Sequence, residues 1–75
     1  MSNAHEQKLL KSFGERLAEV RKSRGLTQQE LAERVGMSVV AIAYIETGKR
    51  WTRLGTLHKI ARNLDVKIGD LFGDL

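Results

Sequence analysis

The stretch TQQELAERVGMSVVAIAYIETGKR, residues 27–50, decides the fold. Thr27 and Glu30 form a capping box, in which the threonine hydroxyl accepts from a helix amide and the glutamate reaches back to the cap. The helix that follows is predicted to end at Gly36, because glycine takes the positive φ of a sharp reversal at little cost. Ser38 caps the next helix. Two short helices joined by a glycine turn indicate a helix-turn-helix, although an ordinary helical hairpin has the same pattern.

Working outward, apolar residues recur at helical spacing along the whole chain, and no alternating strand pattern interrupts them. The first helix is predicted to present one apolar side, which consists of Leu9, Leu10, Phe13, Leu17 and Val20. Gly14, inside the same helix, predicts a close backbone approach. Thr52 is the expected cap of the fourth helix, whose apolar side is predicted to face inward and consists of Leu54, Leu57, Ile60, Ala61 and Leu64. The sequence thus predicts an all-α fold of five helices over residues 5–24, 28–35, 39–47, 53–63 and 67–72.

The length of 75 residues bounds the chain to one domain. We assign residues 9–75 to it and interpret residues 1–8 as an N-terminal extension, whose first residues are compatible with an expression scar. No apolar run approaches the roughly 20 residues that a spanning helix needs, and no secretory signal is present. The expected location is cytoplasmic, with no membrane partner.

Basic residues outnumber acidic ones by 13 to 9, which gives a net charge of +4. Between Thr47 and Arg62 five residues are basic and none is acidic. Such a stretch favours a polyanionic partner, while the alternative is a solvated basic face.

Catalytic constellations are missing from the sequence. Cysteine is absent, the two histidines (His5 and His58) are far apart, and no nucleophile–base pair or clustered metal ligands occur. We therefore predict no enzyme activity, no catalytic residue, no metal and no cofactor.

Several segments together resemble the Xre family, the Cro and phage-repressor type of helix-turn-helix. The resemblance covers about residues 13–72. It implies a compact five-helix lambda-repressor-like domain that binds double-stranded DNA and regulates transcription. The segments that carry it are Phe13-Gly14-Glu15-Arg16-Leu17, Leu26-Thr27-Gln28-Gln29-Glu30-Leu31-Ala32, Val35-Gly36-Met37-Ser38, Ile45-Glu46-Thr47-Gly48-Lys49-Arg50, Leu57-His58-Lys59-Ile60-Ala61 and Asp70-Leu71-Phe72.

The family match implies that Gln28, Lys49, Arg50 and, less directly, Arg53 contact DNA phosphates. Gln28 suits this role because a helix N-terminus already favours an anion. A surface glutamine and a solvated basic loop are the alternatives. Such contacts supply affinity and register but carry no direct sequence information.

The resemblance also implies that the bases are read by Ser38, Val39, Val40, Ala43 and Tyr44. Better-known relatives carry hydrogen-bonding side chains at several of these positions, whereas this chain has two valines and an alanine. Aliphatic side chains meet thymine methyls or sugar carbons, so we expect thymine contacts together with shape readout through the phosphates. The alternative is that the valines contact protein.

Arg21 and Glu46 match a family pair that forms a partly buried ion pair between the first and third helices. That pair would fix the tilt of the third helix, and two exposed unpaired charges are the alternative. Trp51 has no family role to transfer. It is expected to cover an edge of the core, to pack in a dimer interface or to lie against DNA.

Family members usually dimerise, which implies a homodimer. The candidate interface is the C-terminal set, which equally suits capping of the core: Leu64, Ile68, Leu71, Phe72 and Leu75.

The predicted function is a dimeric repressor that reads a pseudopalindromic operator with the helix at about residues 39–47. The alternatives are a helical protein-interaction module, an antitoxin, or a restriction–modification controller with little sequence readout of its own. A toxin or another regulator is a possible second partner.

Overall fold

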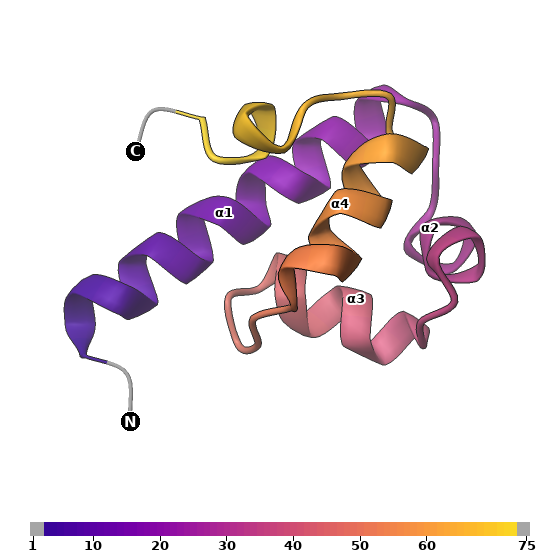
Figure 1. Cartoon of the computed structure of the whole chain (residues 1–75). Coiled ribbons are helices and arrows are strands. Elements are labelled where there is room, and N and C mark those ends of the chain that lie inside the picture. The colour runs from indigo at the N-terminus through magenta and orange to yellow at the C-terminus, as the bar shows by residue number, and fades with distance from the viewer. Residues whose placement is uncertain (1–2, 74–75) are drawn as a thin grey trace.

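The computed structural model describes residues 3–73, and all of their regular structure is helical (Figure 1). The all-α prediction is confirmed. The four α-helices are α1 (Ala4–Ser23), α2 (Gln28–Val35), α3 (Val39–Glu46) and α4 (Leu54–Asn63). The predicted fifth helix is instead a single 3₁₀ turn, η1 (Ile68–Leu71). Four residues are too few for a ladder of i→i−4 bonds, and Gly69 in their middle disfavours an α-helix.

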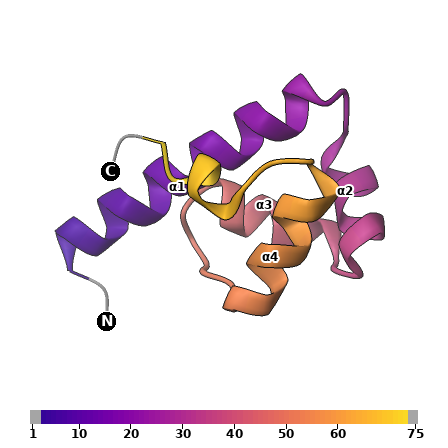
Figure 2. The same ribbon diagram turned by 45° about the horizontal axis from the view of Figure 1, so that its top comes forward.

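The long helix α1 contacts α3 and η1 (Figures 1 and 2). Its C-terminal half contacts α3, and α2 packs on both α3 and α4. The segment after α4 returns over α1, so that η1 contacts α1 and α4. Residues 4–8, which the sequence assigns to an N-terminal extension, form the first turns of α1 and are exposed.

The core lies between these helices and contains the apolar residues that the periodicity predicts. Two residues expected to face inward are exceptions. Leu54 is 72% exposed, because no other described element covers the first turn of α4 on that side, and Leu9 is exposed where α1 extends past the core. The largest fully buried side chains are Phe13, Leu17, Leu31, Ile42, Ile45, Leu57, Ile60, Leu64 and Leu71.

Two glycines are required by the geometry. Gly36 ends α2 in the left-handed conformation, with φ of 71°, and so turns the chain from α2 into α3 as predicted. Gly14 faces the last turn of α3, where a methyl group would overlap the main-chain oxygens of Ile45 and Glu46. The close approach predicted from Gly14 is therefore the contact between α1 and α3.

Side chains cap three of the four α-helices. Thr27 and Glu30 make the predicted capping box, with the Thr27 amide donating to Glu30 Oε1 at 2.9 Å and the Glu30 amide donating to Thr27 Oγ1 at 3.0 Å. The expected cap at Thr52 is wrong. Arg53 occupies the N-cap position of α4 and makes no side-chain capping bond, so the first amides of α4 have no side-chain acceptor.

The capping box predicts a pH dependence of stability. The hydrogen bond from the Thr27 amide, followed by the bond between the two side chains, lowers the pKa of Glu30 from its ordinary value of 4.5. A lowered folded pKa contributes stability that is fully present above the unfolded pKa and is lost as the pH falls through the folded value. Replacing Glu30 by Gln should therefore destabilise the domain more at pH 7 than at pH 3. Urea unfolding at both pH values measures this. Glu33→Gln on the same helix is the control, and equal costs of Glu30→Gln at both pH values would contradict the prediction.

Candidate nucleic-acid interface

The outer face of α3 is formed by the residues that the sequence assigns to base reading. Val39, Val40 and Tyr44 are 42%, 54% and 46% exposed, and Ala43 beside them is half-buried. Positions i, i+1, i+4 and i+5 share one side of a helix. The opposite side carries Ile42, Ile45 and other buried residues. Ser38 is exposed at the N-cap, where its Oγ accepts from the Ala41 amide at 3.0 Å.

A buried ion pair fixes the other side of α3. Arg21 Nε donates to Glu46 Oε2 at 2.7 Å, and a second guanidinium nitrogen donates to Glu46 Oε1 at 3.1 Å. The third nitrogen donates to the carbonyl oxygen of Leu26, just before α2. Every buried nitrogen and oxygen of the described side chains has a hydrogen-bond partner. The pair therefore ties α1 to the end of α3 and to the segment that leads into α2.

Gln28 joins the same network. Its side-chain amide donates to Glu46 Oε1 at 2.9 Å, so that Glu46 accepts from residues on both α1 and α2. Gln28 is half-buried and is the first residue of α2. The sequence placed Gln28 at the helix N-terminus but gave no signal for its bond to Glu46, because only the packing of α2 against α3 brings the two side chains together.

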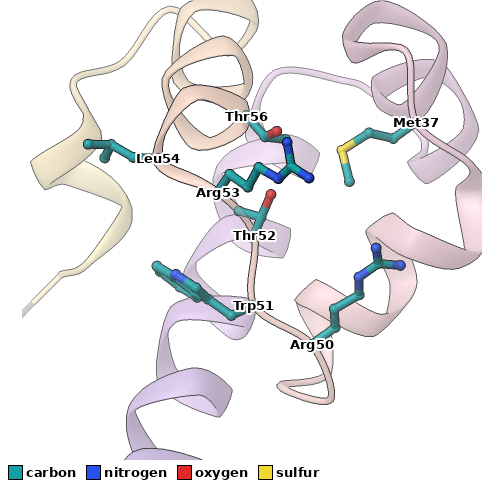
Figure 3. A pocket seen from close by; sticks show the side chains of 7 residues that line it. All are labelled: Met37, Arg50, Trp51, Thr52, Arg53, Leu54 and Thr56. Atoms are coloured by element: carbon teal, nitrogen blue, oxygen red, sulfur yellow. The ribbon is translucent and has the colours of Figure 1, made fainter.

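A basic groove lies between the α2–α3 turn and the segment that leads into α4 (Figure 3). Arg50 and Arg53 enter it from two sides, with Met37 across from them. No carboxylate lines it. The uncapped N-terminus of α4 adds partial positive charge at the same place. The lining residues are Met37, Arg50, Trp51, Thr52, Arg53, Leu54 and Thr56.

Lys49 does not line this groove and reaches the outer face of α3 instead. Its ammonium stands 5.9 Å from the centre of the Tyr44 ring, within the range of a cation–π contact. No local signal indicated this pairing, nor the place of Met37 and Thr56 in the groove. The path of the loop after α3 decides these contacts, and no local motif encodes that path.

Trp51 covers an edge of the core, one of the three roles considered for it. Its ring meets Phe13 edge-on at 4.9 Å between centroids, and Phe72 lies 5.1 Å from Phe13 and 6.2 Å from Trp51. Trp51 is nevertheless 46% exposed. Because the Trp51 ring is half exposed, part of this aromatic cluster remains open to solvent and available to a partner.

The candidate dimer interface needs correction. Leu64 and Leu71 are wholly buried in the monomer, because α4 and η1 turn them into the core, so neither can contact a second copy. Ile68 and Phe72 are partly buried against the core and keep some exposed surface. Leu75 lies outside the described residues.

Other site types find little support. Among residues 3–73, no cluster of three His, Cys, Asp or Glu side chains could hold a metal ion. None of the helices in this part of the chain has the length and apolar character needed to cross a membrane.

A short helix held outward by a glycine turn is the geometry with which such motifs reach into the major groove. The fold and this surface therefore define a class, the helix-turn-helix DNA-binding domains. Residues 17–71 match the helix-turn-helix family HTH_3, and the chain belongs to that family. The resemblance to Xre-type domains is thereby confirmed.

Similar proteins are transcriptional regulators. An uncharacterized HTH-type transcriptional regulator from Methanothermobacter thermautotrophicus is 46% identical over 75% of this chain and 83% of its own. The HTH-type transcriptional repressor RghR from Bacillus subtilis is 40% identical over 76% of this chain and 43% of its own. The crystal structure of the restriction-modification controller protein C.AhdI from Aeromonas hydrophila superimposes with a TM-score of 0.81 at 36% identity, covering 84% of this chain and 96% of that one.

Family membership settles the broad function. The chain is a helix-turn-helix transcriptional regulator with double-stranded DNA as its partner. This class is not enzymatic, which confirms the prediction that the chain is not an enzyme.

Proposed function

We propose that the domain is a dimeric repressor that reads a pseudopalindromic operator with α3. The exposed face of α3 is the observation that carries this proposal. Val39 and Val40 form the first turn of α3 and protrude into solvent, and recognition helices present such N-terminal residues to base edges. Ser38, Ala43 and Tyr44 complete the proposed reading surface. The proposed activity takes place in the cytoplasm, as the sequence predicts.

Phosphate contacts are proposed on both sides of α3. Gln28 stands at the N-terminus of α2, and Arg53 stands at the uncapped N-terminus of α4, where helix dipoles favour an anion. Arg50 lines the groove with Arg53, and Lys49 precedes it on the same loop. The ion pair of Arg21 with Glu46 supports this arrangement, because it holds α3 and Gln28 in a fixed relation.

The length of α3 supports the proposed homodimer. Eight residues contact only a few base pairs, and a two-fold pair of such helices can read two half-sites one helical turn apart. The exposed part of Trp51, together with Leu54, Ile68 and Phe72, is the apolar surface that supports association. These residues replace the buried Leu64 and Leu71 as the proposed interface.

Selection of bound duplexes from a random DNA pool tests the proposal. We expect an enriched motif with inverted-repeat symmetry, with half-site centres about 10 base pairs apart. Sedimentation of the complex should give two chains per duplex, and a reporter gene downstream of the motif should be repressed. Absence of any complex at low ionic strength would overturn DNA reading, and an asymmetric motif bound by one chain would overturn the dimer.

The proposed division of roles makes a prediction about variants. Arg50→Ala and Gln28→Ala should weaken binding to all duplexes by similar factors, because phosphates are the same in every sequence. Arg50→Ala should also reduce the slope of log affinity against log salt by about 1, the value for one lost phosphate contact. Tyr44→Phe should instead change which duplexes are preferred. Fluorescence anisotropy over a salt series measures both effects, with Arg34→Ala on α2 as a control for loss of one exposed charge. A salt slope that Arg50→Ala leaves unchanged would contradict the assignment.

A restriction–modification controller is the second candidate. The match to the A. hydrophila controller over 96% of that chain favours it. An operator found upstream of a methyltransferase or endonuclease gene would support this role.

A further inference from the structure

The exposed face of α3 has almost no hydrogen-bonding side chains. Val39 and Val40 are its most exposed aliphatic residues, and Ala43, one turn further along the same side, is half-buried. Tyr44 and Glu46 are the two polar residues of α3. Glu46 is buried and bonded to Arg21 and Gln28, so it cannot reach a base.

The hydroxyl groups at the two ends of α3 each make a hydrogen bond to the backbone of the helix. Ser38 Oγ accepts from the Ala41 amide at 3.0 Å. Thr47 Oγ1 donates to the carbonyl oxygen of Ala43 at 2.8 Å. The phenol of Tyr44 is the one exposed hydrogen-bonding side chain within α3, and Ser38 at the N-cap adds only the O–H of its hydroxyl. A helix of this composition cannot distinguish base pairs mainly by their donor and acceptor patterns.

The major groove offers one apolar group that such a surface can recognise. Thymine presents a methyl group on C5, and aliphatic side chains contact it favourably. 5-Methylcytosine carries the same methyl on the same ring carbon, so it presents the same apolar feature in the groove. Building on the proposed function, we infer that Val39, Val40 and Ala43 read the C5 methyl of pyrimidines, supplied by thymine or by 5-methylcytosine.

The experiment uses the full chain and the duplex selected from the random pool. Uracil replaces thymine at one position at a time, which removes only the methyl. We expect affinity to fall about fourfold for each contacted methyl, the factor that burial of one methyl-sized group gives. In the second arm, a contacted thymine–adenine pair is changed to cytosine–guanine, with and without a C5 methyl on the cytosine. We expect the methylated duplex to bind about fourfold more tightly than the unmethylated one.

The two arms distinguish the sources of the methyl. A response in both shows that either pyrimidine is read, and a response to uracil alone assigns the methyl to thymine. Equal affinity for thymine and uracil at every position, with no gain from methylcytosine, overturns the inference while DNA binding itself stands. No complex with any duplex overturns the proposed function and this inference with it.

Variants assign the effect to α3. Val40→Ala should bring the ratio of thymine to uracil affinity towards one, because it removes the aliphatic group that meets the methyl. Leu9→Ala is the matched control, since Leu9 is an exposed aliphatic residue on α1 and its loss should leave the ratio unchanged. The ratio compares two duplexes with one protein, so it does not depend on the folded fraction of a variant. The assignment of methyl reading to α3 would be overturned if Val40→Ala and Val39→Ala both retain the full ratio of thymine to uracil affinity.

Discussion

Replacing Arg21 by alanine should lower the free energy of unfolding by about 3–5 kcal/mol, the cost of leaving one member of a buried ion pair without its partner. Glu46 would remain buried and charged, with only the Gln28 amide to donate to it. The Leu26 carbonyl oxygen would also lose its donor. A domain of this size has a total stability of about 4–11 kcal/mol, so the variant should be partly unfolded near 37 °C. Urea unfolding followed by circular dichroism measures the loss.

Two further variants separate the ion pair from simple loss of charge. Lys22→Ala removes the exposed cation next to Arg21 on α1 and should change stability by less than about 0.5 kcal/mol. The double variant Arg21→Met with Glu46→Leu should recover most of the stability, because apolar residues of similar volume often replace buried ion pairs at no net cost. The double variant should nevertheless bind DNA more weakly than the unchanged protein, since Gln28 loses the carboxylate that orients it. If Arg21→Ala costs no more than Lys22→Ala, the buried pair is not a stabilising contact.

Gly14→Ala should lower the free energy of unfolding by about 3 kcal/mol, which is the upper part of the range for overpacking a closed contact. The added methyl would overlap the carbonyl oxygens of Ile45 and Glu46, which belong to the backbone of α3 and cannot rotate away. The overlap can then be removed only if α1 moves away from α3, and that movement would also stretch the hydrogen bonds between Arg21 and Glu46. For a domain of this length the cost corresponds to a fall in Tm of more than 10 °C. Thermal unfolding measures it.

Gly55→Ala is the matched control for this substitution. Gly55 lies in the first turn of α4 with nothing within 4 Å of an added Cβ and with an ordinary φ. Alanine there should stabilise the domain by up to about 1 kcal/mol through its higher helix propensity. Equal effects of the two substitutions would contradict the interpretation of Gly14 as the contact point between α1 and α3.

Local signals in the sequence predicted the elements well. The capping box at Thr27, the glycine at position 36 and the cap at Ser38 depend only on residues within one turn of each other, and each is found in the structure. The inward residues of α2, α3 and most of α4 also follow from helical spacing. Predictions were wrong where an element ends. Thr52 is not the cap because α4 begins one residue later than expected, with Arg53 at the N-cap. Leu54 and Leu9 are exposed because burial depends on neighbouring elements and not on the residue's own helix.

The sequence by itself determined that the chain is helical, that a glycine turn joins α2 to α3, and that the outer face of α3 is aliphatic. These features follow from backbone conformation and from side-chain chemistry over a few adjacent residues. The tertiary structure decided between the core and a dimer interface for Leu64 and Leu71, and it alone decided that Trp51 packs on Phe13 and that Glu46 accepts from both Arg21 and Gln28. The contacts of Glu46 and of Trp51 join residues that are 18 to 38 positions apart in the sequence. Their existence depends on how helices pack, which no local pattern specifies.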